Sequence, residues 1–394
     1  MPDMQRQSCA GRPMGTRGQP QQSPGDCGPE GSSGRRGRVT LPTMAWFPRV
    51  SLRIVAMIAA GALLVLAALL YLLLPPTNSV LQREVQTYET WVNGFAAGLG
   101  GRPAVVILEP DALAELSACR GSAQQQARLQ MLSYAVQTLH SENDHVYLDA
   151  GHSNWVPAAQ MAVRLEAADI AQAYGFSLNV SNYEPTGQQI SYARELDRDL
   201  GMAKRFVVDT SRNGAGSASG LRDPGAGRLS RALRATRADG LAKRLFTNPD
   251  TQAAKWVRAH PGDPLAREIG KRIADQPTAQ WFGPWNTDIT AAVSGYTAAA
   301  SREHKVPVLV AYAIPRSGCG GNSMNDAGQW CNVPGQQLGS APQVLDNRGD
   351  MGLWIKPPGE SDGDCGVGAG TQAGEFSPSI ATQLITGRSL AAGD

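Results

Sequence analysis

The segment AVVIL, residues 104–108, decides the fold: five apolar residues run together and then stop at Glu109, Pro110 and Asp111. A short, continuous apolar run of this kind is typical of a strand buried on both faces, as in a parallel sheet covered by helices. In α/β barrels the loops at the carboxyl ends of such strands carry the functional groups. The segment therefore predicts a buried strand with a candidate site at Asp111.

The same pattern recurs along the chain, with helix-like stretches such as residues 124–139 and 157–174 between the runs. This alternation predicts βαβα units and a parallel sheet. Seven candidate strands suit a closed or nearly closed barrel. The six further runs are HVYL (145–148), FSLNV (176–180), RFVV (205–208), AQWF (279–282), VPVLVAY (306–312) and LWI (353–355).

Composition places the chain among globular proteins, since 42% of its 394 residues are hydrophobic and 18% are charged. The formal net charge of +2 is unevenly divided. Residues 1–53 hold eight arginines against three acidic residues, so the remainder carries a net charge of −3. A slightly acidic body argues against nucleic-acid binding, which depends on clustered Lys and Arg.

Residues 54–74 form an uncharged run of 21 residues, long enough at about 1.5 Å per residue to cross a bilayer core. We expect a single transmembrane helix there. Arginines cluster just before it, so the positive-inside rule predicts a disordered cytoplasmic tail over 1–53 and an outward-facing domain over 80–394. A cleaved signal peptide is the alternative, and it would make the protein secreted.

Two cysteines, Cys9 and Cys27, precede this run, and four follow it. An even number on the oxidising side predicts two disulfides, with three pairings open. A zinc site is less favoured because there is no CxxC pair, and we expect no metal. The four cysteines are Cys119, Cys319, Cys331 and Cys365.

Polar and aromatic residues gather at the predicted strand ends. Carboxylate pairs and indoles together suit glycoside hydrolysis, in which one carboxylic acid protonates the leaving oxygen and flat rings hold sugars. The alternative for any single strand-end Asp is a helix cap or a turn former. The set comprises Asp111, Asp149, Asn182, Asp209, Trp285, Tyr312, Glu360 and Asp362.

Several longer strings closely resemble glycoside hydrolase family 6, the cellulases. They are VVILEPDAL (105–113), YLDAGHSNW (147–155), FSLNVSNY (176–183), VVDTSRNG (207–214), QWCNVPGQQLG (329–339) and LWIKPPGESDG (353–363), joined by LFTNPDTQAAKW (245–256) and VPVLVAYAIP (306–315). The resemblance implies a distorted seven-stranded parallel β/α barrel, similar to a TIM barrel. It also implies extracellular action on β-1,4-glucan with inversion and without any cofactor.

Position by position, the resemblance implies that Asp111 is the general acid, that Asp149 supports its raised pKa, and that Asp362 matches the proposed base. Five further positions match subsite residues: Tyr312, Arg212, Lys356, Glu360 and His152. Three indoles match sugar-stacking positions: Trp155, Trp281 and Trp330. The implied disulfides join Cys119 to Cys319 and Cys331 to Cys365.

Two features depart from the family pattern. Gly318 stands where the family has an Asp that assists the acid or relays a proton, and Asp326 is eight residues further on. The blocks are also reordered: the block over 245–315, first in the family, here follows the block over 105–214, and a flexible linker over 215–240 is expected between them.

The leading hypothesis is a monomeric, membrane-anchored endo-β-1,4-glucanase, and short loops after Trp155 predict an open cleft. One alternative is a catalytically impaired glucan-binding protein, because of Gly318. Another is a misfolded product of the rearranged block order.

Overall fold

The computed structural model describes residues 77–118, 120–141, 143–214, 244–316, 336–346, 348–361, 372 and 374–387, all within the unit Leu73–Asp394. The predicted tail (1–53), transmembrane run (54–74) and linker (215–240) lie outside these residues. Within the described part of the chain, no helix has the length and apolar character needed to span a bilayer.

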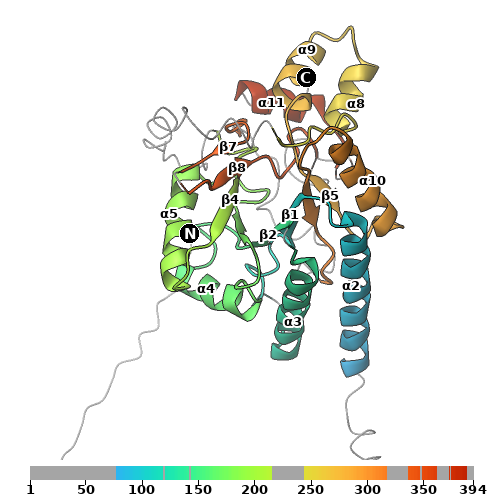
Figure 1. Ribbon diagram of the computed structural model, residues 1–394. Coiled ribbons are helices and arrows are strands. Elements are labelled where there is room, and N and C mark those ends of the chain that lie inside the picture. The colour runs from blue at the N-terminus through green and yellow to red at the C-terminus, as the bar shows by residue number, and fades with distance from the viewer. Residues whose placement is uncertain are drawn as a thin grey trace, which may run out of the picture. The chain divides into compact units, whose positions relative to one another are not determined.

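Eight strands form one curled, mostly parallel sheet in the order β5-β6-β1-β2-β3-β4-β8-β7 (Figure 1). Six of the predicted strands are present, and the seventh, predicted over 353–355, overlaps β8 only at Leu353. The strands are β1 (Ala104–Leu108), β2 (Asp144–Asp149), β3 (Gly175–Leu178), β4 (Arg205–Asp209), β5 (Gln280–Phe282), β6 (Val308–Ala311), β7 (Gln343–Val344) and β8 (Met351–Leu353).

The prediction of seven parallel strands needs one correction. The two-residue strand β7 adds an eighth member that runs antiparallel to β8, and it is too short to give a sequence pattern. The strand β5 lies at the opposite edge of the sheet from β7. Among the described residues, β5 does not pair with β8, so the barrel is not closed by strand pairing. Instead, the backbone N–H of Ala279 donates to the carbonyl of Trp354 at 2.9 Å, and the indole of Trp281 donates to Ile355 at 2.9 Å. These bonds draw the sheet edges together without closing a ladder.

Strands from both sequence blocks lie in the same sheet. β6 pairs with β1 in register, with Val105 opposite Val308 and Leu108 opposite Ala311, and β5 pairs with β6. The segment 244–316 therefore supplies the two strands beside β1, although it follows β4 in the chain.

Helices cover the outer face of the sheet, and the helix before β1 was not predicted. The helices are α2 (Thr77–Leu99), α3 (Ser122–Leu139), α4 (Ala158–Ala167), α5 (Thr186–Asp199), α8 (Gln252–Ala259), α9 (Ala266–Ile269), the π-helix η1 (Gly270–Ala274), α10 (Ile289–Arg302) and α11 (Pro378–Thr386). The predicted helix over 157–174 stops at Ala167, and Asp169 soon afterwards has a φ of 69°.

The helix α2 packs against both α3 and α10, so it joins the segments 104–214 and 244–316 (Figure 1). The contact with α10 is close because Gly94 and Gly98 face it. A Cβ on Gly98 would lie 2.6 Å from the Cβ of Val293, and the hydroxyl of Thr290 donates to the carbonyl of Gly94 at 3.0 Å. Small residues at this spacing let two helix backbones approach each other.

The core lies on both faces of the sheet, as the unbroken apolar runs predict. Along β1, Val106 and Leu108 pack with the helices, whereas Val105 and Ile107 belong to a second cluster on the other face. Trp281 and Tyr312 border this second cluster. The inner face of the sheet therefore leads to the polar groups described next.

Candidate active site

The loop after β1 has an unusual backbone. Glu109 and Asp111 have φ angles of 49° and 69°, a region that costs a residue other than glycine about 1–3 kcal/mol. Hydrogen bonds hold the loop in this conformation: the N–H of Glu109 donates to Ala311 at 2.8 Å, and that of Asp111 donates to Oδ1 of Asp149 at 3.0 Å. These hydrogen bonds hold the backbone of Asp111 in place at the end of β1.

Two strand-end aspartates organise the loops of their neighbours in the same way. Asp149 ends β2 and accepts the N–H of Asp111 from the loop after β1. Asp209 ends β4 and accepts the N–H of Ser181, from the loop after β3, at 3.0 Å. Asp209 also accepts the N–H groups of Ile355 and Lys356, so it ties the loops after β3, β4 and β8 together. At Asp209 the turn-forming alternative is the correct interpretation.

Asp149 differs from Asp209 because the N–H group that it accepts belongs to Asp111, whose pKa the charge of Asp149 raises. It is fully buried, and it accepts bonds from the N–H of Gly151 at 3.0 Å and the hydroxyl of Ser177 at 2.9 Å. Burial raises its pKa to about 7, although these hydrogen bonds oppose the shift. Asp149 thus titrates near neutral pH beside Asp111.

The surroundings of Asp111 favour the protonated form of its carboxyl group. Burial raises the pKa of its carboxyl group well above the usual range, and the charges of Asp149 and Glu115 raise it further, while Arg128 lowers it. A buried carboxylic acid with a like charge beside it is the arrangement that a general acid requires.

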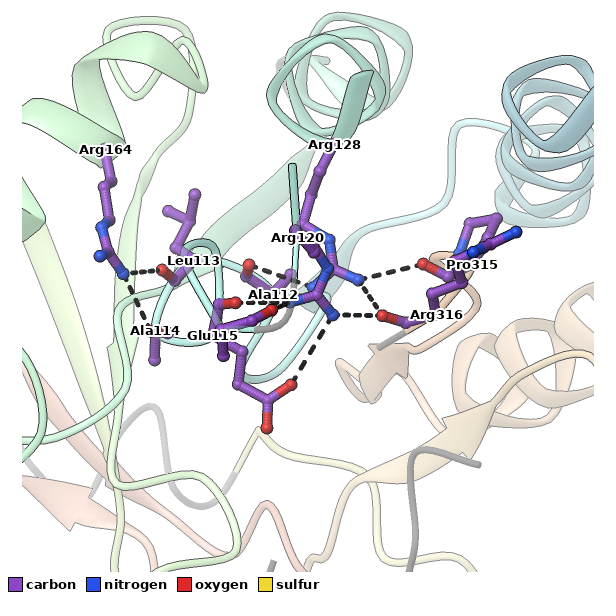
Figure 2. Close-up of polar contacts among 10 residues, drawn as sticks. Ala112, Leu113, Ala114, Glu115, Arg120, Arg128, Arg164, Pro315 and Arg316 are labelled. Carbon is purple, nitrogen blue, oxygen red and sulfur yellow. Dashed lines mark hydrogen bonds and ion pairs between the residues drawn. The ribbon is translucent and has the colours of Figure 1, made fainter. Parts of the chain in front are cut away.

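Arginine side chains hold the Asp111 loop from two helices (Figure 2). Arg164 of α4 donates to the carbonyls of Leu113 at 2.6 Å and Ala114 at 2.9 Å. Arg128 of α3 donates to the carbonyl of Ala112 at 3.3 Å and to that of Pro315, beyond β6, at 3.0 Å. The loop is therefore clamped between α3, α4 and the segment after β6.

Arg128 is 1% exposed, so its charge acts in a buried environment. Burial lowers its pKa to about 10, which still leaves the guanidinium protonated at neutral pH. Arg120 adds a bond to the carbonyl of Glu115 at 2.5 Å, and both Arg120 and Arg128 donate to the carbonyl of Arg316. These contacts fasten the two loops that follow the adjacent strands β1 and β6.

Glu109 is a second buried acid in this loop that the sequence analysis did not assign. Its oxygens accept the N–H groups of Ala313 and Ile314, each at 3.0 Å, so it also joins the loops after β1 and β6. Burial raises its pKa to about 7, and the two N–H groups oppose that shift. It is absent from the cavity wall described below. We interpret Glu109 as a structural acid.

A cavity of about 650 Å³ lies at the carboxyl ends of the strands. Six of the predicted site residues line it: Asp111, Trp281, Trp285, Tyr312, Lys356 and Glu360. The rings of Trp281 and Tyr312 meet edge to face, with centroids 5.4 Å apart, and the indole N–H is bonded to Ile355. The structure thus brings the predicted acid and an indole held in place to one cavity.

Four other predicted residues lie near this edge of the sheet but do not line the cavity: His152, Trp155, Asn182 and Arg212. The ring of His152 packs 5.3 Å from that of Trp155, and burial lowers its pKa to about 4, so it is neutral at pH 7. The amide of Asn182 donates to the nearby carbonyl of Val180 at 3.1 Å. Arg212 is buried and donates to the carbonyl of Ser181.

The remaining predicted site residues lie outside the described residues: the proposed base Asp362, the indole of Trp330 and the four cysteines Cys119, Cys319, Cys331 and Cys365. The same holds for Gly318 and Asp326. Within the described ranges, no group of three or more His, Cys, Asp or Glu side chains is placed to bind a metal ion.

The structure adds cavity residues that the sequence analysis did not assign to the site. Asp250 lines the cavity from the segment before α8, Gln252 and Lys255 line it from α8, and Gln280 comes from β5. The first three lie in the string over 245–256. The family resemblance assigned no role to any residue of that string, so the sequence offered no reason to choose them.

The fold and cavity define an α/β protein that presents a buried carboxyl group of raised pKa at the carboxyl ends of the strands of a curled, mostly parallel sheet. Residues 78–223, 241–326 and 316–388 match Glycosyl hydrolases family 6. The chain belongs to this family, and the resemblance drawn from the sequence is confirmed.

Endoglucanase 1 of Streptomyces halstedii is 31% identical over 306 residues, which cover 76% of this chain and 61% of that protein. Endoglucanase A of Thermobispora bispora is 48% identical over 134 residues, or 33% of this chain and 29% of that protein. The endoglucanase Cel6 from Mycobacterium tuberculosis, solved with a thio-linked cellobioside, has 29% identity and a TM-score of 0.46, covering 77% of this chain and 68% of that one. This chain thus spans about three fifths of the first relative's length.

Proposed function

We propose that this protein is an endo-β-1,4-glucanase that hydrolyses cellulose or a related β-1,4-glucan, with Asp111 as the general acid. The observation that carries the proposal is the buried Asp111 carboxyl group, which lines the cavity and whose pKa is raised by burial and by the charge of Asp149. Family membership and the names of the endoglucanase relatives support the choice of substrate.

The cavity wall fits a neutral, hydroxyl-rich chain. Besides Asp111, its ionisable side chains of either sign are Asp250, Glu360 and Glu375 against Lys255 and Lys356, so no single sign dominates. Such groups exchange hydrogen bonds with sugar hydroxyls, while Trp281 offers an apolar face.

In the proposed reaction, Asp111 gives its proton to the glycosidic oxygen as the bond from that oxygen to the anomeric carbon breaks. A water molecule attacks the anomeric carbon from the opposite face and loses its proton to Asp362, which inverts the configuration. Asp149 supports this step because its negative charge raises the pKa of Asp111. No metal or organic cofactor takes part.

We further propose that residues 54–74 anchor the protein in a membrane and that the catalytic domain, 80–394, faces outward as a monomer stabilised by two disulfides. If the N-terminal segment is cleaved, the same domain is secreted. The uncharged run and the arginines before it support this topology.

The test is hydrolysis of a soluble β-1,4-glucan by the purified full chain, followed by reducing-end release and viscosity. We expect a rapid fall in viscosity, as internal cleavage requires, and a loss of about 10²- to 10⁴-fold in rate for Asp111→Asn. The matched control is Asp199→Asn, because Asp199 is exposed at the end of α5 and does not line the cavity. Equal rates for wild type and Asp111→Asn would overturn the assignment.

A further inference from the structure

Trp285 is an exposed indole at the wall of the cavity. It is 51% exposed, although a tryptophan side chain is usually well buried. It lines the same cavity as Asp111 and Trp281, and it follows β5 by only three residues. A large apolar ring left in contact with water at a binding cavity is a feature that a ligand can cover.

The turn that carries Trp285 is fixed on both sides. The N–H of Gly283 donates to the side-chain oxygen of Asn286 at 2.9 Å, and the N–H of Asn286 donates back to the carbonyl of Gly283 at 3.0 Å. This pair of bonds closes the residues 283–286 into a tight turn. The backbone of Trp285 therefore has little freedom to move away from the cavity.

The indole itself packs against Gly283. A Cβ on Gly283 would lie 2.3 Å from Cζ3 and 2.4 Å from Cη2 of Trp285, so only glycine allows the ring to lie in this position. One part of the ring is thus supported by backbone while the rest remains exposed. An aromatic ring held in this way loses little conformational entropy when a flat ligand stacks on it.

Polar groups accompany the ring on the same wall. Asp250, Lys255 and Gln280 line the cavity from the segment before α8, from α8 and from β5. An aromatic face together with carboxylate, ammonium and amide groups is the chemistry that recognises a pyranose ring, which has apolar C–H faces and hydroxyl edges.

We propose that Trp285 forms an outer sugar-binding subsite of the cavity, where its exposed indole stacks on a glucose ring of the β-1,4-glucan. This inference rests on the proposed function and extends it to the number of glucose units that the protein recognises. The subsite contributes to binding of long oligosaccharides and is out of reach of short ones.

The experiment measures binding of cellotriose, cellotetraose, cellopentaose and cellohexaose by calorimetry, using the full chain carrying Asp111→Asn so that the ligand is not cleaved. Trp285→Ala, added to this variant, should weaken the binding of cellohexaose on the order of tenfold and leave cellotriose unchanged. Trp285→Phe keeps a ring and should recover part of the loss.

The matched control is Tyr174→Ala. Tyr174 is another exposed aromatic residue, 41% exposed. It directly precedes β3, so it lies at the amino ends of the strands, away from the cavity at their carboxyl ends. Its removal should change no affinity. An equal loss for every oligosaccharide length, or no loss for cellohexaose with Trp285→Ala, would overturn the outer subsite. If the Asp111→Asn chain binds none of the four sugars, the proposed function itself fails.

Discussion

Replacing Asp149 by Asn should stabilise the fold at high pH and not at low pH. Burial raises the pKa of Asp149 from 3.8 to about 7, so between these values the folded protein holds a proton that the unfolded chain has released. The free energy of unfolding therefore falls as the pH rises through this window. A difference of roughly three pKa units corresponds to about 4 kcal/mol.

The Asn side chain can keep the three hydrogen bonds of Asp149. Its oxygen can accept the N–H groups of Asp111 and Gly151, and its amide can donate to the hydroxyl of Ser177, which is able to rotate. The two proteins should thus be about equally stable at pH 4, where Asp149 is half protonated even when unfolded. At pH 8 the variant should be more stable by as much as about 4 kcal/mol.

The assay is urea unfolding of the full chain and of the Asp149→Asn variant at a series of pH values. A stability difference for Asp149→Asn that does not grow between pH 4 and pH 8 would refute the reasoning. The gain in stability should also come with a lower pKa of Asp111 and an earlier loss of activity as the pH rises.

The arginine contacts and the helix contact give two more predictions. Arg128→Met removes a charge that lowers the pKa of Asp111, so activity should persist to higher pH. Arg164→Met breaks bonds to the same loop, but its charge is not among those that shift the pKa of Asp111. It should therefore leave the pH dependence of activity unchanged. Kinetic pH profiles of both variants check this, and equal profiles would contradict it. Gly98→Ala should cost about 2 kcal/mol in thermal unfolding, because its Cβ would crowd α10. Gly295→Ala, in open space on α10, should instead stabilise by roughly 0.5–1 kcal/mol, and a loss at both positions would argue against close packing as the cause.

The sequence predicted the strands well because each is a short apolar run that is buried on both faces. The apolar runs do not define the exact first and last residues of the strands, since these depend on contacts with other parts of the structure. β3 stops at Leu178 because Asn179 turns to a φ of 65°. β8 lies two residues earlier than predicted, because the N–H groups of Ile355 and Lys356 are used by Asp209 instead of a neighbouring strand.

The sequence likewise predicted only part of the candidate site. Asp111 and Asp149 were identifiable from a motif. The motif could not show that Asp149 accepts the N–H of Asp111, whereas Asp209 accepts that of Ser181. Trp285 and Lys255 come to the cavity only because residues 244–316 fold beside β1. Nor could periodicity show that Arg128 and Arg164 reach from two helices to one loop.

The central claim is that Asp111 delivers the proton to the leaving group, and the most direct test compares aryl β-cellobiosides with different leaving groups. Wild type and Asp111→Asn should differ little in bond cleavage for a dinitrophenyl leaving group, which needs no proton. For an unactivated alkyl or sugar leaving group the variant should be slower by about 10²- to 10⁴-fold. A variant that is slowed equally with all leaving groups would contradict the role of Asp111 as the general acid.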